Sequence, residues 1–128
     1  EGQLEFEELV GEGGYGQVYK ARWMQADVAA KAFRCNAGDP ISRDFCSELR
    51  LLRRLRHPNL TLLLGFCLRP KHIIVTEFVR GGSLYDLLHR KRHVPDWSLS
   101  QVVGIAREIC LGMVYLHAQD IVHCDLKS

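Results

Sequence analysis

The sequence predicts an α+β fold, with a strand-rich first part and a helical second part. Between residues 4 and 78 most segments alternate apolar and polar residues or form short apolar runs, and both patterns are typical of β-strands. After Gly81 and Gly82 the apolar residues recur at helical spacing instead. The chain has 128 residues, 47% hydrophobic and 25% charged, which is enough apolar material for one globular core.

Five segments are predicted to be strands. The first three are LEFEEL, QVYKARW and DVAAKAF, at residues 4–9, 17–23 and 27–33. The apolar runs LTLLLGFCL and IIVTEFV, at residues 60–68 and 73–79, predict two buried strands.

One helix is predicted between the third and fourth strands. Asp39 and Pro40 form a start signal, with the acid as N-cap and the proline in the first helical position. His57-Pro58-Asn59 ends the helix, because the residue before a proline is pushed out of helical geometry. The apolar residues that recur every three or four positions are Ile41, Phe45, Leu49, Leu52 and Leu55.

Two further helices are predicted after the glycine pair. A short one runs from Ser83 to His89. Ser98 and Gln101 have the spacing of a capping box, which predicts the start of a long helix. The apolar face of that helix consists of Leu99, Val102, Val103, Ala106, Ile109, Cys110, Met113 and Leu116.

The composition argues against several classes of protein. The formal net charge is only +2, and the cluster of Arg50, Arg53, Arg54 and Arg56 alternates with leucines at helical spacing. This favours a solvated helix face over a nucleic-acid patch, so we expect no nucleic-acid partner. No apolar run approaches the roughly 18 residues of a membrane span, so we expect no membrane segment in this stretch.

The five cysteines form no C-x-x-C pair and are odd in number. Neither a disulfide framework nor a zinc site is indicated, and a reducing, cytoplasmic setting fits best. The first residue is Glu1 rather than methionine, so we expect this stretch to be a piece of a longer, intracellular chain.

The stretch GEGGYGQV, residues 11–18, contains four glycines, three of them with the spacing G-x-G-x-x-G. It lies between two predicted strands, whereas the dinucleotide-binding fingerprint lies between a strand and a helix. A hairpin is predicted, with a tip that offers backbone N–H groups to phosphate oxygens. The alternative is a tight turn with a purely structural role.

Two charged residues fit a phosphate-binding site. Lys31 lies on a predicted strand between the small residues Ala30 and Ala32, so its ammonium can reach a nucleotide phosphate without crowding. Glu48 lies on or beside the apolar face of the following helix, where an acid is unfavourable unless it is paired. Each residue alone is ordinary, but together they predict an ion pair that holds the lysine in position.

The last segment, IVHCDLKS, carries His123, Asp125 and Lys127. An aspartate in such a loop can orient a hydroxyl group and accept its proton. A lysine two residues later can stabilise charge on a phosphoryl group in transfer.

Taken together, these motifs resemble the signature set of the protein kinase family. GEGGYGQV, VAAK, Glu48 and HCDLKS follow the order and spacing of its glycine-rich loop, strand lysine, helix glutamate and catalytic loop. HPNL and TEFVRGGSLYDLLH are similar to the loop after the glutamate helix and to the hinge between the lobes.

The resemblance covers essentially the whole chain and implies a partial kinase domain over residues 1–128. Residues 1–79 would form the strand-rich small lobe, with its one long helix, and the hinge. Residues 80–128 would form the first helices of the helical large lobe, as far as the catalytic loop.

The resemblance also implies roles for individual residues. Lys31 would contact the α- and β-phosphates of ATP, Glu48 would orient Lys31, and Asp125 would be the catalytic base, with Lys127 beside it. The residues implied in ATP binding are Gly11, Glu12, Gly13, Gly14, Tyr15, Gly16, Val18, Ala29, Lys31, Thr76, Glu77, Phe78 and Val79.

Some of these implied roles are specific. Thr76 would guard the rear of the ATP pocket, while Val18 and Ala29 would sandwich the adenine. Leu52, Leu63 and His123 would stack into a hydrophobic spine.

Within the family, DLKS resembles serine/threonine kinases of the tyrosine-kinase-like group, such as mixed-lineage, Raf-type and plant kinases. This implies ATP and Mg²⁺ as cofactors and a Ser or Thr hydroxyl of a protein substrate as acceptor. The magnesium-binding Asn is expected two residues beyond Ser128, with D-F-G further on. Cys124 replaces the arginine that in the family pairs with a phosphorylated activation loop.

Two functions remain open at this point. The first is ATP-dependent phosphorylation of proteins, and the second is a nucleotide-binding pseudokinase or scaffold without turnover. An oxidoreductase nucleotide domain is excluded, because the glycines precede a strand.

Overall fold

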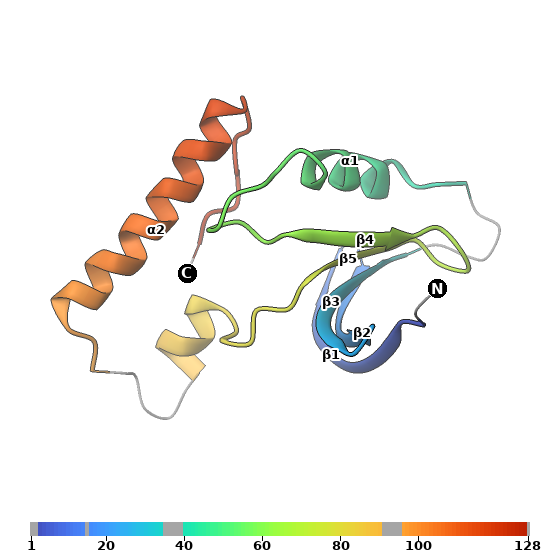
Figure 1. The fold of residues 1–128 in the computed structure, drawn as a ribbon, viewed down its shortest axis with the longest axis horizontal. Helices are drawn as coiled ribbons and strands as arrows, with labels where there is room; N and C mark the ends of the chain where they lie inside the picture. Colours follow the sequence, from blue (N-terminus) through green and yellow to red (C-terminus); the bar gives the residue numbers. More distant parts are fainter. Residues whose placement is uncertain (1–2, 15, 35–39, 91–95, 128) are drawn as a thin grey trace. The chain divides into compact units, whose positions relative to one another are not determined.

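The computed structural model describes residues 3–14, 16–34, 40–90 and 96–127 (Figure 1). The chain divides into two compact units. Unit 1 consists of Glu1–Arg56 and Thr61–Val79, and unit 2 of His57–Leu60 and Arg80–Ser128.

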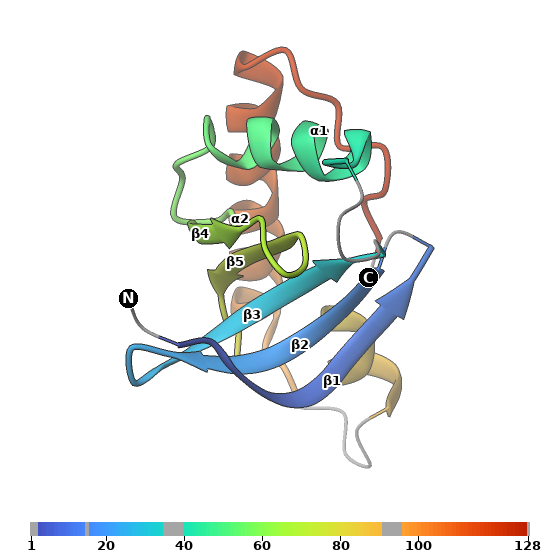
Figure 2. The same ribbon diagram turned by 90° about the vertical axis from the view of Figure 1, so that its right-hand side faces the viewer.

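Unit 1 is built around a five-stranded antiparallel sheet with the strand order β1-β2-β3-β5-β4 (Figure 2). The predicted α+β fold is confirmed, since the sheet and its helix have the architecture of a protein-kinase small lobe. The strands are β1 (Glu5–Gly13), β2 (Gly16–Trp23), β3 (Ala26–Phe33), β4 (Leu63–Cys67) and β5 (Ile73–Glu77).

The fourth strand differs from its prediction. β5 begins with three buried residues, Ile73 to Val75, as expected for a buried strand. β4 alternates between half-buried and exposed residues instead. Its two half-buried ends pack on different sides of the sheet, Leu63 against the cluster around Phe45 and Cys67 against the cluster around Ala30. The cause is an irregularity between Leu63 and Gly65, which shifts the pairing with β5 and so changes the face to which the following residues point.

The strand register assigns side chains to two faces of the sheet, because directly paired residues point to the same face. Val18 pairs with Lys31 and Ala29 pairs with Thr76, which defines one face. The other face contains the pairs Tyr19–Ala30, Ala21–Val28, Ala30–Val75 and Ala32–Ile73.

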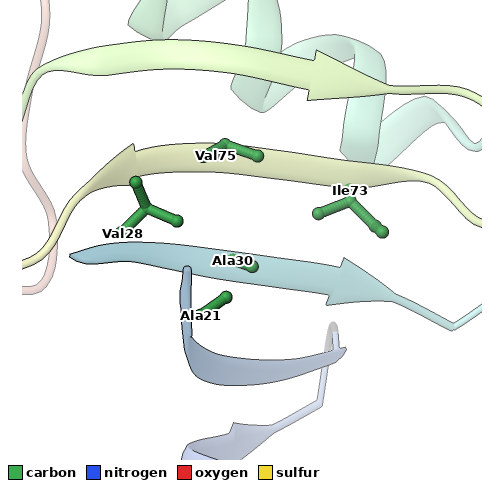
Figure 3. Packing of buried hydrophobic residues seen from close by; sticks show 5 residues of the cluster. All are labelled: Ala21, Val28, Ala30, Ile73 and Val75. Atoms are coloured by element: carbon green, nitrogen blue, oxygen red, sulfur yellow. The ribbon is translucent and has the colours of Figure 1, made fainter. Parts of the chain in front are cut away.

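This second face, called the opposite face, carries the first part of the core. The small side chains of Ala21 and Ala30 let strands β2, β3 and β5 bury Val28 and Val75 between them (Figure 3). Leu4, ahead of β1, packs against this cluster from outside. The residues of this cluster on β3, Val28 and Ala30, are two positions apart, as the two-residue alternation of a strand requires.

The first face, called the α1 face, is covered by the helix α1 (Arg43–Leu52). Phe45 of α1 is 1% exposed and packs with Phe33 and Ile74 in the second core cluster. Its ring meets the ring of Phe33 edge to face at 5.4 Å, a favourable aromatic geometry. Leu49, Leu52 and Leu63 pack around this cluster.

Both predicted ends of this helix were wrong. The helix begins at Arg43, because the Ser42 side chain accepts a hydrogen bond from the backbone N–H of Phe45 at 3.1 Å and so acts as the N-cap. Pro40 lies before the helix, and Asp39 lies outside the described residues. The helix ends at Leu52, five residues before His57, and Leu55 is buried without being helical.

In the described part of unit 2, two helices lie at or close to the predicted positions. η1 (Asp86–Arg90) is a short π-helix, and the Ser83 hydroxyl accepts a hydrogen bond from the backbone N–H of Asp86 at 3.0 Å just before it. α2 (Leu99–Ala118) begins with the predicted capping box of Ser98 and Gln101, in which both reciprocal hydrogen bonds are present. Only Gly112 and Leu116 of α2 are buried, so most of its apolar face is exposed in the part of unit 2 that the structure describes.

α2 is also relevant to the membrane prediction. It is 20 residues long with a mean hydropathy of 1.4, which is long and apolar enough by length and composition to cross a membrane. Arg107 and Glu108 interrupt it, so the sequence contains no unbroken apolar run of this length. Core helices of water-soluble proteins pass the same test, and the absence of a membrane segment stays a prediction.

The loop His57–Leu60 follows α1 in the sequence but belongs to unit 2. The side-chain amide of Asn59 donates a hydrogen bond to the backbone carbonyl of Glu108 in α2 at 2.7 Å. The ring of His57 lies 5.1 Å from that of Tyr115. A Cβ at Gly112 would lie 3.4 Å from the backbone oxygen of Asn59, so the glycine allows the loop to approach the helix closely.

The glycines of the β1–β2 hairpin differ in what the fold requires of them. A Cβ at Gly16 would lie 2.2 Å from the carbonyl oxygen of Ala32, and the φ of Gly16 is +156°. We expect Gly16→Ala to lower the free energy of unfolding by about 2 kcal/mol, because the new methyl group must push β2 away from β3.

Gly13→Ala is the matched control for this prediction. A Cβ at Gly13 meets no atom within 4 Å, so the change should alter stability by less than about 0.5 kcal/mol. Urea denaturation of both variants measures the difference. Equal stability of the two variants would contradict the steric role of Gly16.

Candidate functional site

The glycine-rich stretch forms the predicted hairpin between β1 and β2, with Gly13 paired to Gly16 at its end. The side chain of Glu12 accepts a hydrogen bond from the Gln17 amide at 3.3 Å and forms an exposed ion pair with Arg34, just after β3, at 3.5 Å. Tyr15, predicted to bind the nucleotide, lies outside the described residues. The carboxylate of Glu12 thus serves contacts within the protein.

The backbone near the hairpin tip is open. A Cβ added at Gly13 or Gly14 would meet no protein atom within 4 Å, unlike one at Gly16. Packing within the described residues therefore does not explain why both positions lack a side chain. Close approach of a ligand to the backbone is a use of glycine that fits this observation.

Four predicted site residues share the α1 face of the sheet. Val18 lies opposite Lys31 on neighbouring strands, and Ala29 lies opposite Thr76. All four are half-buried, whereas the opposite-face residues Ala21, Val28 and Ala30 are fully buried. The α1 face therefore keeps partly accessible surface beside Lys31.

Lys31 and Glu48 form the predicted ion pair. The Lys31 Nζ lies 2.5 Å from the Glu48 Oε2, and the two side chains are 27% and 32% exposed. The ammonium also lies 5.0 Å from the centre of the Phe33 ring, a cation–π distance. The pair therefore fixes the direction of the Lys31 side chain while leaving part of its ammonium accessible.

The position of Glu48 follows from the packing of α1. Glu48 is three residues after Phe45, so the two side chains lie on the same side of the helix. Phe45 is locked among Phe33, Phe66 and His72, whose ring centres lie 5.4, 6.5 and 5.3 Å from its own. Burial of Phe45 therefore presents Glu48 to Lys31.

The segment after β5 was predicted to bind adenine through the backbone of Glu77 to Val79. The backbone N–H of Glu77 already donates a hydrogen bond to the carbonyl oxygen of Leu62 at 3.1 Å. Of the backbone groups of Glu77, only the carbonyl oxygen is therefore left for a hydrogen bond to adenine. Its carboxylate accepts the N–H of Leu62 at 2.8 Å. Phe78 lies under the Lys20 ammonium at 5.9 Å, and Val79 is 59% exposed.

The loop after α2 holds the second group of predicted site residues. Lys127 Nζ lies 3.1 and 3.0 Å from the two carboxylate oxygens of Asp125, and both side chains are 73% exposed. The backbone N–H of Asp125 donates to His123 Nδ1 at 3.3 Å. Cys124 between them has a φ of +59°, a conformation that is uncommon for residues other than glycine. The tight turn therefore presents the Asp125 carboxylate to solvent.

The structure thus brings the predicted residues together in two groups, one in each unit. Unit 1 holds the glycine hairpin, Lys31 with Glu48, and the β3–β5 residues, and Leu52 and Leu63 meet in its second core cluster. Unit 2 holds His123, Asp125 and Lys127. The functions assigned to these residues, including the shared spine of Leu52, Leu63 and His123, stay predictions.

Sequence reasoning missed the residues that support the site. Ser42 caps α1, Phe45 anchors it, and Leu62 ties down the end of β5 through Glu77. Phe45 was noted only as one of several apolar positions. Its role as anchor depends on rings from β3, β4 and the residue before β5, which no local sequence pattern connects.

Comparison with known proteins gives the same picture over the whole chain. The family described as protein tyrosine and serine/threonine kinase matches residues 4–128. Serine/threonine-protein kinase STY46 of Arabidopsis thaliana is 38% identical over 98% of the chain and 22% of its own length. Human mitogen-activated protein kinase kinase kinase 10 is 41% identical over 98% of the chain and 14% of its own length.

A third relative is the mouse serine/threonine-protein kinase A-Raf, 39% identical over 93% of the chain and 19% of its own length. The chain therefore spans 14–22% of the length of these relatives. All three are of the tyrosine-kinase-like type that the DLKS motif predicted.

The strength of the Lys31–Glu48 pair can be measured with a double-mutant cycle. We expect Lys31→Met and Glu48→Gln to show a coupling free energy of about 0.5–1 kcal/mol, because the pair is partly exposed and screened by solvent. Chemical denaturation of the two single variants and the double variant supplies the number. Strict additivity of the two changes would contradict the expected coupling and show that the pair adds no stability in solution.

Proposed function

Since the chain belongs to the protein tyrosine and serine/threonine kinase family, we propose that it supplies the nucleotide-binding and catalytic residues for ATP-dependent phosphorylation of Ser or Thr hydroxyls on proteins. The observation that carries this proposal is the Lys31–Glu48 ion pair on the α1 face, beside Val18, Ala29 and Thr76. A fixed, partly accessible ammonium next to apolar and small side chains suits a nucleotide with its phosphates at the lysine.

The glycine hairpin supports a role in holding the phosphates. Its open backbone at Gly13 and Gly14 can turn N–H groups toward phosphate oxygens, and Lys31 would contact the α- and β-phosphates. Glu48 acts through Lys31 and is a positioning residue. Val18 and Ala29 would enclose the adenine, with Thr76 at the rear of the pocket and backbone groups of Glu77, Phe78 and Val79 at its edge.

Phosphoryl transfer forms a bond between the acceptor hydroxyl oxygen and the γ-phosphorus and breaks the bond to the oxygen that bridges the β- and γ-phosphates. Asp125 would orient the acceptor hydroxyl and take its proton, and its exposed carboxylate suits an incoming substrate. Lys127, paired with Asp125 in the structure, would place positive charge near the transferred group. ADP leaves with the bridging oxygen.

The family uses Mg²⁺ with ATP, where the ion neutralises charge on the phosphates. Among the described residues, no three His, Cys, Asp or Glu side chains lie together in a way that could hold a metal ion. In this proposal the ligands that the family implies for the ion, an Asn and the Asp of D-F-G, would lie in segments after Ser128.

The proposal extends to the organisation of the chain. Residues 1–79 would be the small lobe with the hinge, and residues 80–128 the start of the large lobe. Because the chain spans 14–22% of its relatives, the activity and substrates of the whole protein belong to this proposal as well. An intracellular setting is part of it, since ATP-dependent protein phosphorylation needs intracellular ATP.

Asp125→Asn tests the catalytic assignment in the complete kinase domain. We expect transfer of the γ-phosphate to a Ser/Thr peptide to fall by at least about 100-fold, while the Kd for ATP stays within about twofold, because the base acts on the acceptor and not on the nucleotide. Asp96→Asn, at an exposed aspartate in the same unit, is the matched control and should keep full activity. Radiolabelled transfer and calorimetric ATP titration give the two quantities.

Unchanged transfer by Asp125→Asn would remove Asp125 from the mechanism. If the unaltered domain binds ATP through Lys31 but transfers no phosphate to any peptide or to itself, the alternative of a pseudokinase or scaffold is correct.

Gly13→Ala separates a ligand role of the hairpin from a structural one. The added methyl group meets no protein atom, so the domain should keep its stability while its Kd for ATP rises about tenfold, because the backbone can no longer approach the phosphates closely. Calorimetric titration with ATP measures the change. An unaltered Kd would make the hairpin a structural turn at this position.

A further inference from the structure

Unit 1 has a second concave site that the proposed function does not use. A pocket of about 630 Å³ is lined by Gln3 and Leu4 ahead of β1, by one residue from each of the five strands, and by the segment 69–71. Its floor is formed by Ala32, Cys67 and Ile73, which lie on the opposite face of the sheet. Lys31 and Glu48 lie on the α1 face, so the sheet itself separates the pocket from the proposed nucleotide site.

The lining of this pocket is apolar with a basic rim. Leu4, Phe6 and Tyr19 form its walls, and the rings of Phe6 and Tyr19 meet edge to face at 5.2 Å. Arg69 and Lys71 are exposed and stand at its edge. No acidic residue lines it within the described part of the chain. The ion pairs found among the described residues include neither Arg69 nor Lys71.

These features select a ligand by size and charge. Pockets for small molecules usually measure roughly 300–1,000 Å³ and combine apolar walls with a few placed polar groups. Two cations at the rim of an apolar pocket complement an anion attached to an apolar body. The aromatic walls suit a flat ring, whose faces and edges pair well with Phe6 and Tyr19.

We propose that this pocket binds a small amphiphilic carboxylate, with its aromatic or alkyl body between Leu4, Phe6 and Tyr19 and its carboxylate at Arg69 and Lys71. The inference does not depend on the kinase function, because its residues and its sheet face are distinct from those of the nucleotide site. Binding at the pocket is therefore expected with ATP present or absent.

The test titrates the full-length chain with 2-naphthoate, in the presence of saturating ATP and in its absence. We expect saturable binding with the same Kd in both conditions, and Kd values at least about tenfold weaker for the neutral analogue 2-naphthalenemethanol, which cannot pair with the two cations. Loss of naphthoate binding when ATP is added would place the ligand in the nucleotide site and overturn the proposal. So would equal affinity for the two analogues.

Cys67 reports where the ligand binds. Its thiol is on the pocket floor and donates to the carbonyl oxygen of Arg69 at 2.8 Å, while Cys46 and Cys110 are exposed elsewhere. We expect naphthoate to slow alkylation of Cys67 by iodoacetamide several-fold, as measured by peptide mass spectrometry, and to leave the rates at Cys46 and Cys110 unchanged. Equal rates at Cys67 with and without bound naphthoate would refute the assignment.

Charge variants test the rim. The double change Arg69→Gln and Lys71→Gln should weaken naphthoate binding about tenfold without affecting the fold, since both side chains are exposed. The matched control, Arg43→Gln with Arg50→Gln, removes the same net charge from exposed positions of α1 and should bind as the unaltered chain does. If both double variants bound naphthoate equally weakly, the loss of affinity would come from the lower net charge of the protein, and the proposal would be overturned.

Discussion

Burial of the Phe45 side chain is the constraint on which the candidate site in unit 1 depends. One ring, 1% exposed, joins α1 to β3, β4 and the residue before β5 through contacts with Phe33, Phe66 and His72. A buried aromatic side chain contributes several kcal/mol of packing, more than a partly exposed ion pair can. The electrostatic contact of Lys31 with Glu48 is therefore a consequence of hydrophobic packing and does not itself hold the helix in place.

The same face of the sheet shows how a fold keeps a binding surface accessible. On the opposite face, residues with small side chains bring the strands and their valines into a closed core. On the α1 face, α1 covers only the part around Phe33 and Ile74, and Val18, Ala29 and Thr76 stay half-buried. Each face of the sheet thus carries one core cluster and keeps some accessible surface beside it, because the residues of a strand alternate between the two faces.

Much of this arrangement could be predicted from local patterns. Alternation identified the first three strands and apolar runs identified the last two, while the spacing of Ser98 and Gln101 identified the first turn of α2. All of these features depend only on neighbours in the sequence. The start of α1 was predicted wrongly, because Asp39-Pro40 has the local pattern of a helix start whereas the structure uses Ser42 as the N-cap. The edge position of β4 depends on strand order, which one strand's own residues do not encode. The pairing of Lys31 with Glu48 could be inferred, because an unpaired acid beside the apolar face of a helix is unfavourable. The hydrogen bond from the Glu77 N–H to the Leu62 carbonyl oxygen could not be predicted, because no pattern in the sequence indicates it.

The assignment of His57–Leu60 to unit 2 has a consequence for how the chain can be divided. The polypeptide passes between the units after Arg56, after Leu60 and after Val79, so three covalent passages join them. Cleavage of the chain between Gly81 and Gly82 would break only the third passage, the one after Val79. The first fragment would still carry Asn59, whose amide binds the Glu108 carbonyl of the second fragment. Limited proteolysis at the glycine pair should therefore yield two fragments that stay together through the loop 57–60. Two separately expressed fragments should reassemble only if the N-terminal one includes residues 57–60.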